Sequence, residues 1–213
     1  MIRIVRFFAI GCIAAYAGLA GAGGLSSLES FVGKVRSGRA DFTQVVTAPA
    51  RDGQAPRVKT SSGTFEFSRP DRFKFVYRKP FEQSIVADGQ TLWLYDVDLN
   101  QVTARKQAQV LGSTPAALIA AAPDLRALQA NFSLAEAPER DGLQWVLATP
   151  RAKDTQLQSI SVGLRAGELA VLEILDSFGQ RSVLSFSEFQ VNPVLPGKTF
   201  EFKPPVGTDV IRQ

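Results

Sequence analysis

Hydrophobic and polar side chains alternate along most of this chain, which is the pattern of β-strands that bury one face. The clearest stretch covers residues 63–105, where the alternation predicts four strands joined by three turns. The large side chains that recur there at every second position are Phe65, Phe67, Phe73, Phe75 and Tyr77. Residues 90–95 are apolar on both faces, with Leu92 and Leu94 on one side and Trp93 and Tyr95 on the other. Strands with this many aromatic side chains need a cover on their inner face, or a cavity.

One helix is predicted before these strands and another after them. The first has Ser26 or Ser27 as its N-cap and Gly38 at its end, and its apolar stripe consists of Leu28, Phe31, Val32 and Val35. The second covers residues 116–122, with Ser113 or Thr114 as its cap and Pro115 at its first position. This second helix is short and apolar nearly all round, so it must lie buried or cover a hollow.

The rest of the chain predicts further strands and hairpin turns. Residues 39–46 form the first strand, and the Pro-, Gly- and Ser-rich residues 47–62 are expected to form a long connection. A meander of strands follows the second helix, at residues 132–135, 144–149, 157–164, 169–176 and 181–189, with a short strand at 199–202. The predicted fold is mainly β with α: an incomplete, unclosed antiparallel β-barrel of ten or eleven strands, whose short helices form a lid on the concave side.

Residues 1–22 are expected to be a secretory signal peptide, followed by a single domain at residues 23–213. Arg3 and Arg6 provide a basic start, residues 7–19 an apolar middle, and Ala20, Gly21 and Ala22 a small-residue cleavage site. A lipoprotein cleavage box ending at Cys12 is the alternative. It is disfavoured because the apolar stretch before Cys12 is shorter than the roughly 7 to 15 residues of a working apolar core. The mature protein is then exported, and no disulfide supports it.

The composition argues against catalysis and against nucleic acid as a partner. The chain contains no histidine, which excludes Ser-His-Asp and Cys-His catalysis and the common zinc sites. No carboxylate cluster has the spacing of metal ligands, so no cofactor or metal is expected. A pair of carboxylates acting on a sugar stays open, although the acidic residues scatter over turns. Loss of Arg3 and Arg6 with the leader lowers the formal net charge from +4 to +2, a weak attraction for nucleic acid.

The concave side of the predicted sheet has two interpretations. Its inward residues either fill the barrel as an ordinary core or leave a cavity for an apolar ligand. Two features favour the cavity: the inward strands carry rigid aromatic side chains, and the covering helix carries alanines, which leave room.

Five segments, taken in order, resemble the LolA family of outer-membrane lipoprotein carrier proteins. They are ADFTQ at residues 40–44, the Arg69-Pro70 pair, VADGQTLWLYD at 86–96, TPAALI at 114–119 and TFEFKPPVG at 199–207. The resemblance covers nearly all of the expected mature chain. It implies a periplasmic, monomeric chaperone that receives triacylated lipoproteins from an inner-membrane ABC transporter. Such a chaperone carries the acyl chains under a helical lid and delivers them to an outer-membrane receptor.

The same resemblance implies roles for individual residues. Arg69 would hydrogen-bond to carbonyls of the lid backbone and hold the lid shut, although a turn arginine without a gating role is the simpler alternative. The lid residues would be Leu28, Val32, Val35, Ala116, Leu118 and Ile119. The acyl-chain cavity would be lined by Phe65, Phe67, Phe73, Phe75, Tyr77, Leu92 and Leu94. Ala116 and Ala117 stand where relatives can carry bulkier apolar residues, which bears on how tightly the lid closes.

Three other functions stay open at this point. The outer-membrane receptor has a similar fold but is anchored through a lipidated N-terminal cysteine, and the signal peptide and the extra C-terminal strand favour the free carrier. A periplasmic hydrolase acting on carbohydrate or lipid is disfavoured by the missing histidine. A carrier of another lipidic precursor would keep the fold and change only the cargo.

Overall fold

A computed structural model of the chain describes residues 23–50, 54–110, 122–153 and 156–213. The expected signal peptide and the expected second helix, at residues 116–122, fall largely outside these ranges; only Ala122 of that helix is described. The described helices are α1 (Gly24–Lys34), α2 (Gln107–Val110), α4 (Leu125–Asn131) and a short 3₁₀ helix η2 (Gly197–Phe200). The strands are β1 (Ser37–Ala48), β2 (Arg57–Ser68), β3 (Arg72–Lys79), β4 (Gln83–Asp88), β5 (Thr91–Asp96), β6 (Gln101–Lys106), β7 (Phe132–Arg140), β8 (Leu143–Pro150), β9 (Leu157–Arg165), β10 (Glu168–Asp176), β11 (Arg181–Val191) and β12 (Asp209–Arg212).

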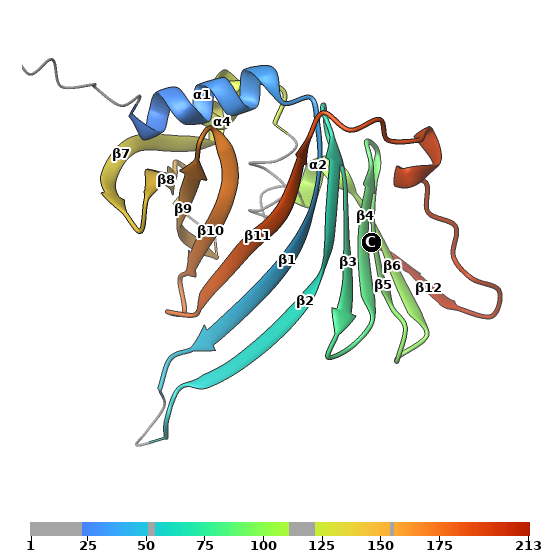
Figure 1. Cartoon of the computed structure of the whole chain (residues 1–213). Coiled ribbons are helices and arrows are strands. Elements are labelled where there is room, and N and C mark those ends of the chain that lie inside the picture. The colour runs from blue at the N-terminus through green and yellow to red at the C-terminus, as the bar shows by residue number, and fades with distance from the viewer. Residues whose placement is uncertain (1–22, 51–53, 111–121, 154–155) are drawn as a thin grey trace, which may run out of the picture.

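All of these strands belong to one curled sheet in the order β12-β6-β5-β4-β3-β2-β1-β11-β10-β9-β8-β7. The sheet is open because β12 and β7 end it on opposite sides, and α1 lies across one end of its concave face (Figure 1). The predicted fold class, a mainly β, unclosed barrel with short helices, is therefore confirmed. The structure adds a twelfth strand, β12, which pairs with β6 in parallel, whereas an antiparallel sheet was expected.

Helix α1 is held differently from the prediction at both ends. Gly23, not Ser26 or Ser27, occupies the N-cap position. Ser27 is buried and its hydroxyl donates instead to Oε1 of Gln144 in β8, at 2.5 Å. The helix ends at Lys34, before Gly38, because Val35 adopts an extended backbone and the chain enters β1 at Ser37. The helix start is thus fixed by the sheet on which it lies.

The long connection expected at residues 47–62 is mostly strand, so this prediction was wrong. β1 and β2 stay paired from Ser37 with Ser68 as far as Ala48 with Arg57. They form an arm that projects beyond the neighbouring strands, at lower left in Figure 1. The error has a physical cause, because a two-stranded ladder is made by backbone groups and tolerates the polar side chains of Lys59 to Ser62.

The main core lies between the concave face and α1. Leu28, Phe31 and Val32 of α1 are buried against inward side chains of the sheet. The central strands contribute a cluster of rings in which Phe65 stacks on Phe75 at 4.3 Å and Phe42 meets Tyr77 edge-on at 5.0 Å between centroids. The alternation seen in the sequence therefore places one aromatic set on the concave face.

The C-terminal segment covers the outer face of β3 to β6. Phe200 of η2 is buried there, and its ring lies 5.7 Å from the guanidinium of Arg72. Phe202 packs against Trp93 and Tyr95, at 5.5 and 5.9 Å between ring centroids. This contact explains why residues 90–95 are apolar on both faces. The strand expected at residues 199–202 is replaced by η2, since Phe200 turns inward to reach the sheet.

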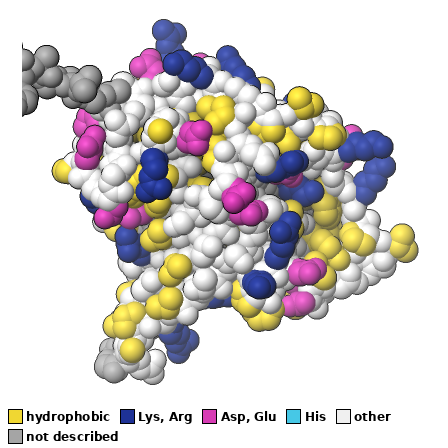
Figure 2. Space-filling view, in the orientation of Figure 1, with side chains coloured by type: hydrophobic (Ala, Val, Ile, Leu, Met, Phe, Trp, Pro, Cys, Tyr) yellow, Lys and Arg dark blue, Asp and Glu magenta, His cyan; other side chains and the backbone are white. Residues whose placement is uncertain are grey.

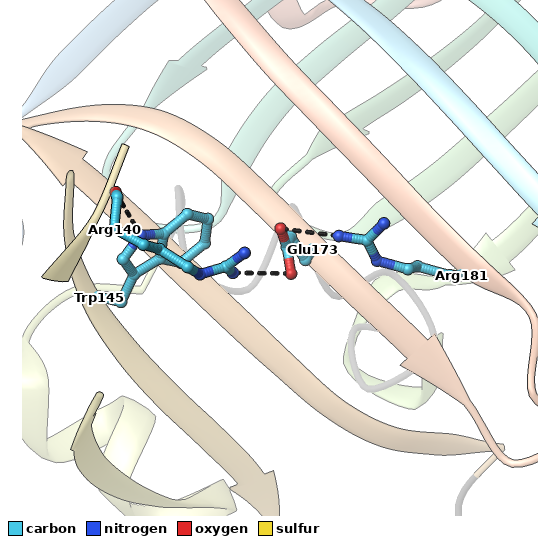
Figure 3. A network of polar contacts seen from close by, with 4 residues as sticks. All are labelled: Arg140, Trp145, Glu173 and Arg181. Carbon is cyan, nitrogen blue, oxygen red and sulfur yellow. Dashed lines mark hydrogen bonds and ion pairs between the residues drawn. The ribbon is translucent and has the colours of Figure 1, made fainter. Parts of the chain in front are cut away.

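A polar network joins the outer face of β10 to its neighbours (Figure 3). Glu173 accepts from Arg140 at 2.9 Å through one oxygen and from Arg181 at 3.0 Å through the other. The Arg140 guanidinium also lies 3.9 Å from the ring centroid of Trp145, whose Nε1 donates to the Arg140 carbonyl at 3.2 Å. The network ties strands β7, β8, β10 and β11 together on the side opposite the main core.

Candidate functional site

The sheet has a closed end, covered by α1, and an open end, where several hairpin turns lie. Leu28, Val32 and Val35, the predicted lid positions in α1, are all buried at the closed end. The other predicted lid residues, Ala116, Leu118 and Ile119, lie outside the described residues. The lid role of all six residues stays a prediction.

Arg69 joins two separate segments at the closed end. Its Nε donates to the carbonyl of Val35, directly after α1, at 2.8 Å. Its Nη1 donates to the carbonyl of Ala122, ahead of α4. The backbone N–H of Arg69 donates to the carbonyl of Arg36 at 2.8 Å. A planar guanidinium presents several donors in fixed directions, so one side chain can hold both segments at once.

The surroundings of Arg69 are unusual for a cation. The residue is only 7% exposed, and its guanidinium lies 5.5 Å from the ring centroid of Phe31 and 5.2 Å from that of Phe67. Burial, together with the positive charge of Arg36, lowers the pKa of Arg69 to about 10. The aromatic faces and the two carbonyls offset part of the cost of taking the charge out of water.

Gln107, which sequence reasoning missed, holds the turn that carries Arg69. Its side chain is buried; Nε2 donates to the carbonyl of Asp71 at 2.5 Å, and Oε1 accepts from the N–H of Gly89 at 3.0 Å. The β2–β3 turn is thereby tied to the β4–β5 turn and to the start of α2. Gln107 follows Arg105 and Lys106 at the end of β6, and nothing in that sequence indicates that its side chain links two turns.

Beneath α1 the interior is filled by the protein's own rings. Phe65, Phe67, Phe73 and Phe75, four of the residues predicted to line an acyl-chain cavity, are almost fully buried in the core. Leu92 packs against the same core and Leu94 is half-buried in β5. The four rings form a chain of contacts, and Phe67 also contacts Phe31 of α1, so a guest at this end would have to displace them.

A hollow of about 460 Å³ lies at the open end of the concave face. Its apolar lining comes from Val46, Tyr77, Phe81 and Leu99, and polar side chains such as Gln44 and Asp96 also border it. Tyr77 is the one predicted cavity residue that borders it, and burial raises the pKa of its hydroxyl to about 12, so it stays protonated. Phe81 and Leu99 were missed, although an apolar side chain inside a turn is a usable signal.

The hollow has the size of a ligand pocket. The volume falls within the roughly 300 to 1,000 Å³ that is common for small-molecule pockets. Within the described ranges, no three His, Cys, Asp or Glu side chains are grouped so that they could hold a metal ion. None of the helices in that part of the chain is long and apolar enough to cross a membrane. Tyr77, which borders the hollow, also contacts the rings of Phe42 and Phe75, so the hollow adjoins the aromatic core.

Comparison with known proteins defines the class. The sequence profile of the outer membrane lipoprotein carrier protein LolA family matches residues 33–203. The outer-membrane lipoprotein carrier protein of Albidiferax ferrireducens is 79% identical over 213 residues, covering 98% of this chain and 100% of the relative. That of Methylibium petroleiphilum is 52% identical over 202 residues, covering 95% of both chains. The chain therefore belongs to the LolA family, as the sequence resemblance indicated.

Among solved structures, an uncharacterized conserved protein from Thermus thermophilus has the same fold. The two superpose with a TM-score of 0.53 at 13% sequence identity, covering 89% of this chain and 97% of the other. At that identity the likeness concerns the fold alone.

Proposed function

We propose that this protein is a periplasmic carrier of lipoproteins, which acts by binding acyl chains and not by catalysis. The observation that carries the proposal is a partly apolar hollow at one end of an aromatic core, at whose other end Arg69 bonds to the carbonyls of Val35 and Ala122. The 79% identity to a named outer-membrane lipoprotein carrier supports the choice of lipoproteins as cargo. A signal peptide at residues 1–22 would direct the chain to the periplasm and then be removed.

The energetics of acyl chains explain why a carrier needs partners. Burying one CH₂ group contributes about 0.8 kcal/mol, so a long chain gains on the order of 12 kcal/mol relative to water. A bilayer offers nearly the same gain, and extraction from a membrane is therefore close to neutral for the carrier. We infer that an energised inner-membrane ABC transporter loads the protein and that an outer-membrane receptor with higher affinity unloads it.

Arg69 would act as a latch between the filled and the open forms of the interior. Breaking its bonds to the carbonyls of Val35 and Ala122 would free α1 and the segment before α4 to move apart. The rings of Phe67 and Phe73 could then separate and extend the hollow toward the closed end. A latch built from a few hydrogen bonds, each contributing about 1 to 3 kcal/mol when charged, is weak enough to release.

The test is transfer of a triacylated lipoprotein from the mature carrier to receptor-bearing vesicles. Arg69→Leu, which keeps an apolar stem but no donors, should bind cargo yet deliver it at least tenfold more slowly or prematurely lose it. Arg69→Lys should restore part of the rate, and Arg165→Leu, an exposed position in β9, is the matched control. Delivery by Arg69→Leu at the wild-type rate would exclude the latch, and failure of the wild type to bind cargo would exclude the carrier.

A further inference from the structure

The β1–β2 arm, three turns at the open end of the sheet and the turn at residues 205–208 form what we call the rim, and the β3–β4 and β5–β6 turns within it border the hollow. The three turns are β3–β4, β5–β6 and β10–β11, and they and the described residues of the β1–β2 arm lie on the side of the sheet away from α1 (Figure 1). The turn at residues 205–208 joins them because the side chain of Asn100 donates to the carbonyl of Gly207 at 2.9 Å. The rim is thus built from segments that are far apart in the sequence.

Five of the described apolar side chains along this rim are strongly exposed. Val58 is 62% exposed, Phe81 59%, Leu99 71%, Phe178 72% and Val206 106%. Each belongs to a different turn or hairpin, so they form separate points around an opening and not one continuous face. Figure 2 shows hydrophobic side chains on the projecting arm at lower left and along the lower right edge.

Basic side chains accompany the apolar ones on one side of the rim. Among the described residues there, the β1–β2 arm and the β3–β4 hairpin carry the exposed Arg57, Lys59, Arg78 and Lys79, with the acidic Glu82 beside them. The Lys59 ammonium lies 5.4 Å from the ring centroid of Phe81. A lysine next to an exposed aromatic ring, with its apolar stem along the surface, suits the boundary between lipid headgroups and acyl chains. The neighbouring β5–β6 turn carries the acidic Asp96 and Asp98, which line the same hollow, so the excess of positive charge is confined to the β1–β2 arm and the β3–β4 hairpin.

We propose that the basic side of the rim docks weakly on an anionic lipid bilayer, with Val58 and Phe81 dipping below the headgroups. A protein partner would bury about 800 Å² on a fitted patch, whereas scattered single side chains on turn tips suit a yielding lipid surface. The hollow opens within the rim, so a guest chain would pass between hydrocarbon and hollow with little exposure to water. This consequence for transfer rests on the proposed carrier function, but the docking itself does not.

The electrostatic part of this docking is small and sensitive to salt. The attraction between a basic side chain and an anionic surface falls off within a Debye length, which is about 10 Å at 0.1 M salt. The basic residues lie on one side of the rim, so we expect reversible binding that weakens as salt is raised. A carrier that must leave the membrane again needs this weak, salt-dependent contact.

The experiment measures binding of the cargo-free mature protein to vesicles of phosphatidylethanolamine and phosphatidylglycerol by flotation, at low salt and at severalfold higher salt. Arg57→Gln/Arg78→Gln/Lys79→Gln should reduce the partition coefficient at least tenfold at low salt. The matched control, Arg126→Gln/Arg165→Gln/Lys198→Gln, makes the same change in net charge at exposed positions outside the rim and should bind as the wild type does. Val58→Ser should weaken binding several-fold at both salt concentrations.

Three results would overturn the docking proposal. The first is that the wild type binds vesicles no better than the rim triple variant, and the second is that the control triple loses as much binding as the rim triple. The third is that the rim triple keeps wild-type vesicle binding and loses delivery only when receptor protein is present, which would make the rim a protein-binding surface. An acyl-chain binding assay on the same samples reports separately on the carrier function, because the docking measurement uses the empty protein.

Discussion

At the scale of single residues, Arg69 and Gln107 organise the closed end through backbone carbonyls. Arg69 holds the ends of two segments, and Gln107 holds the turn two residues beyond Arg69 at Asp71. The arginine was identified through the family resemblance, since its neighbours in the sequence say only that it lies in a turn. Its carbonyl partners, Val35 and Ala122, are distant in the chain, a relation that spacing alone does not reveal.

Replacing Gln107 should loosen this arrangement. Gln107→Leu leaves the part-buried carbonyl of Asp71 and the N–H of Gly89 without their partner, which costs about 1 kcal/mol of unfolding free energy. Gln107→Glu keeps an acceptor for Gly89 but has no donor for Asp71, so it should be destabilised as well. Urea denaturation measures both, with Gln158→Leu at an exposed position in β9 as the control. If Gln107→Leu lowered the free energy of unfolding no more than the control does, Gln107 would not stabilise the two turns.

Glu173 gives the outer face a dependence on pH. Burial acts to raise the pKa of its carboxyl, but hydrogen bonds and charges from Arg140 and Arg181 outweigh burial and lower the pKa below its usual value. Because the folded-state pKa lies below the unfolded-state value of about 4.3, the network stabilises the fold at neutral pH. That contribution is lost as the pH falls through the folded-state pKa.

Glu173→Gln should therefore cost about 1 kcal/mol of unfolding free energy at neutral pH, the upper range for exposed ion pairs. The difference from wild type should shrink toward zero at acid pH, where the wild-type carboxyl is itself protonated. Thermal unfolding across this pH range checks the prediction, and Glu168→Gln in the exposed β9–β10 turn serves as control. An equal deficit at both ends of the pH range would show that the charge of Glu173 plays no part.

At the scale of elements, strands were predictable where one face is buried and misjudged where it is not. In β3 and β9 one face is buried, so apolar side chains alternate with others along the sequence, and this pattern predicted both strands. The distal halves of β1 and β2 extend past the core, and their polar side chains looked like a loop. β12 was missed because its four residues pair with β6 without adding a buried side chain.

Gly63 shows how closely β2 and β3 approach each other. The ladder shifts register between Ser62 and Gly63, and a Cβ atom built on Gly63 would lie 1.9 Å from the carbonyl oxygen of Val76. Gly63→Ala should therefore destabilise the protein by about 1 to 3 kcal/mol, because the backbone of β3 must move. Gly33→Ala, in α1 with open space around it, should be neutral or stabilising by up to about 1 kcal/mol. Chemical denaturation measures the free energy of unfolding of both variants. Equal values would show that β2 and β3 do not crowd a side chain at position 63.

At the scale of the whole molecule, the concave side is neither entirely filled nor entirely hollow. The two interpretations left open by the sequence each describe one end: packed rings beneath α1 and a hollow of about 460 Å³ at the rim. Sequence alternation assigns residues to the concave face but does not tell how far along the strands the packing stops. That boundary depends on where α1 lies, and its position is set by contacts to β7, β8 and β9.

Filling the hollow should therefore impair binding without impairing folding. Ser61→Trp places a large ring among the lining residues, whereas Ser62→Trp, its neighbour in β2, points to the opposite face. We expect Ser61→Trp to lower the affinity for a fluorescent acyl probe at least tenfold and Ser62→Trp to change it less than twofold. Both should unfold within a few degrees of wild type. Equal affinity in the two variants would mean that guests do not use this hollow.

The open sheet has a mechanical consequence. Since β7 and β12 form the two free ends of the strand order in the described part of the chain, no ladder of hydrogen bonds fixes the circumference. The sheet can widen by bending of its strands, so that guests of different width are accommodated without breaking the hydrogen bonds between strands. Elastic compliance of this kind would let one protein serve many cargoes with similar ease.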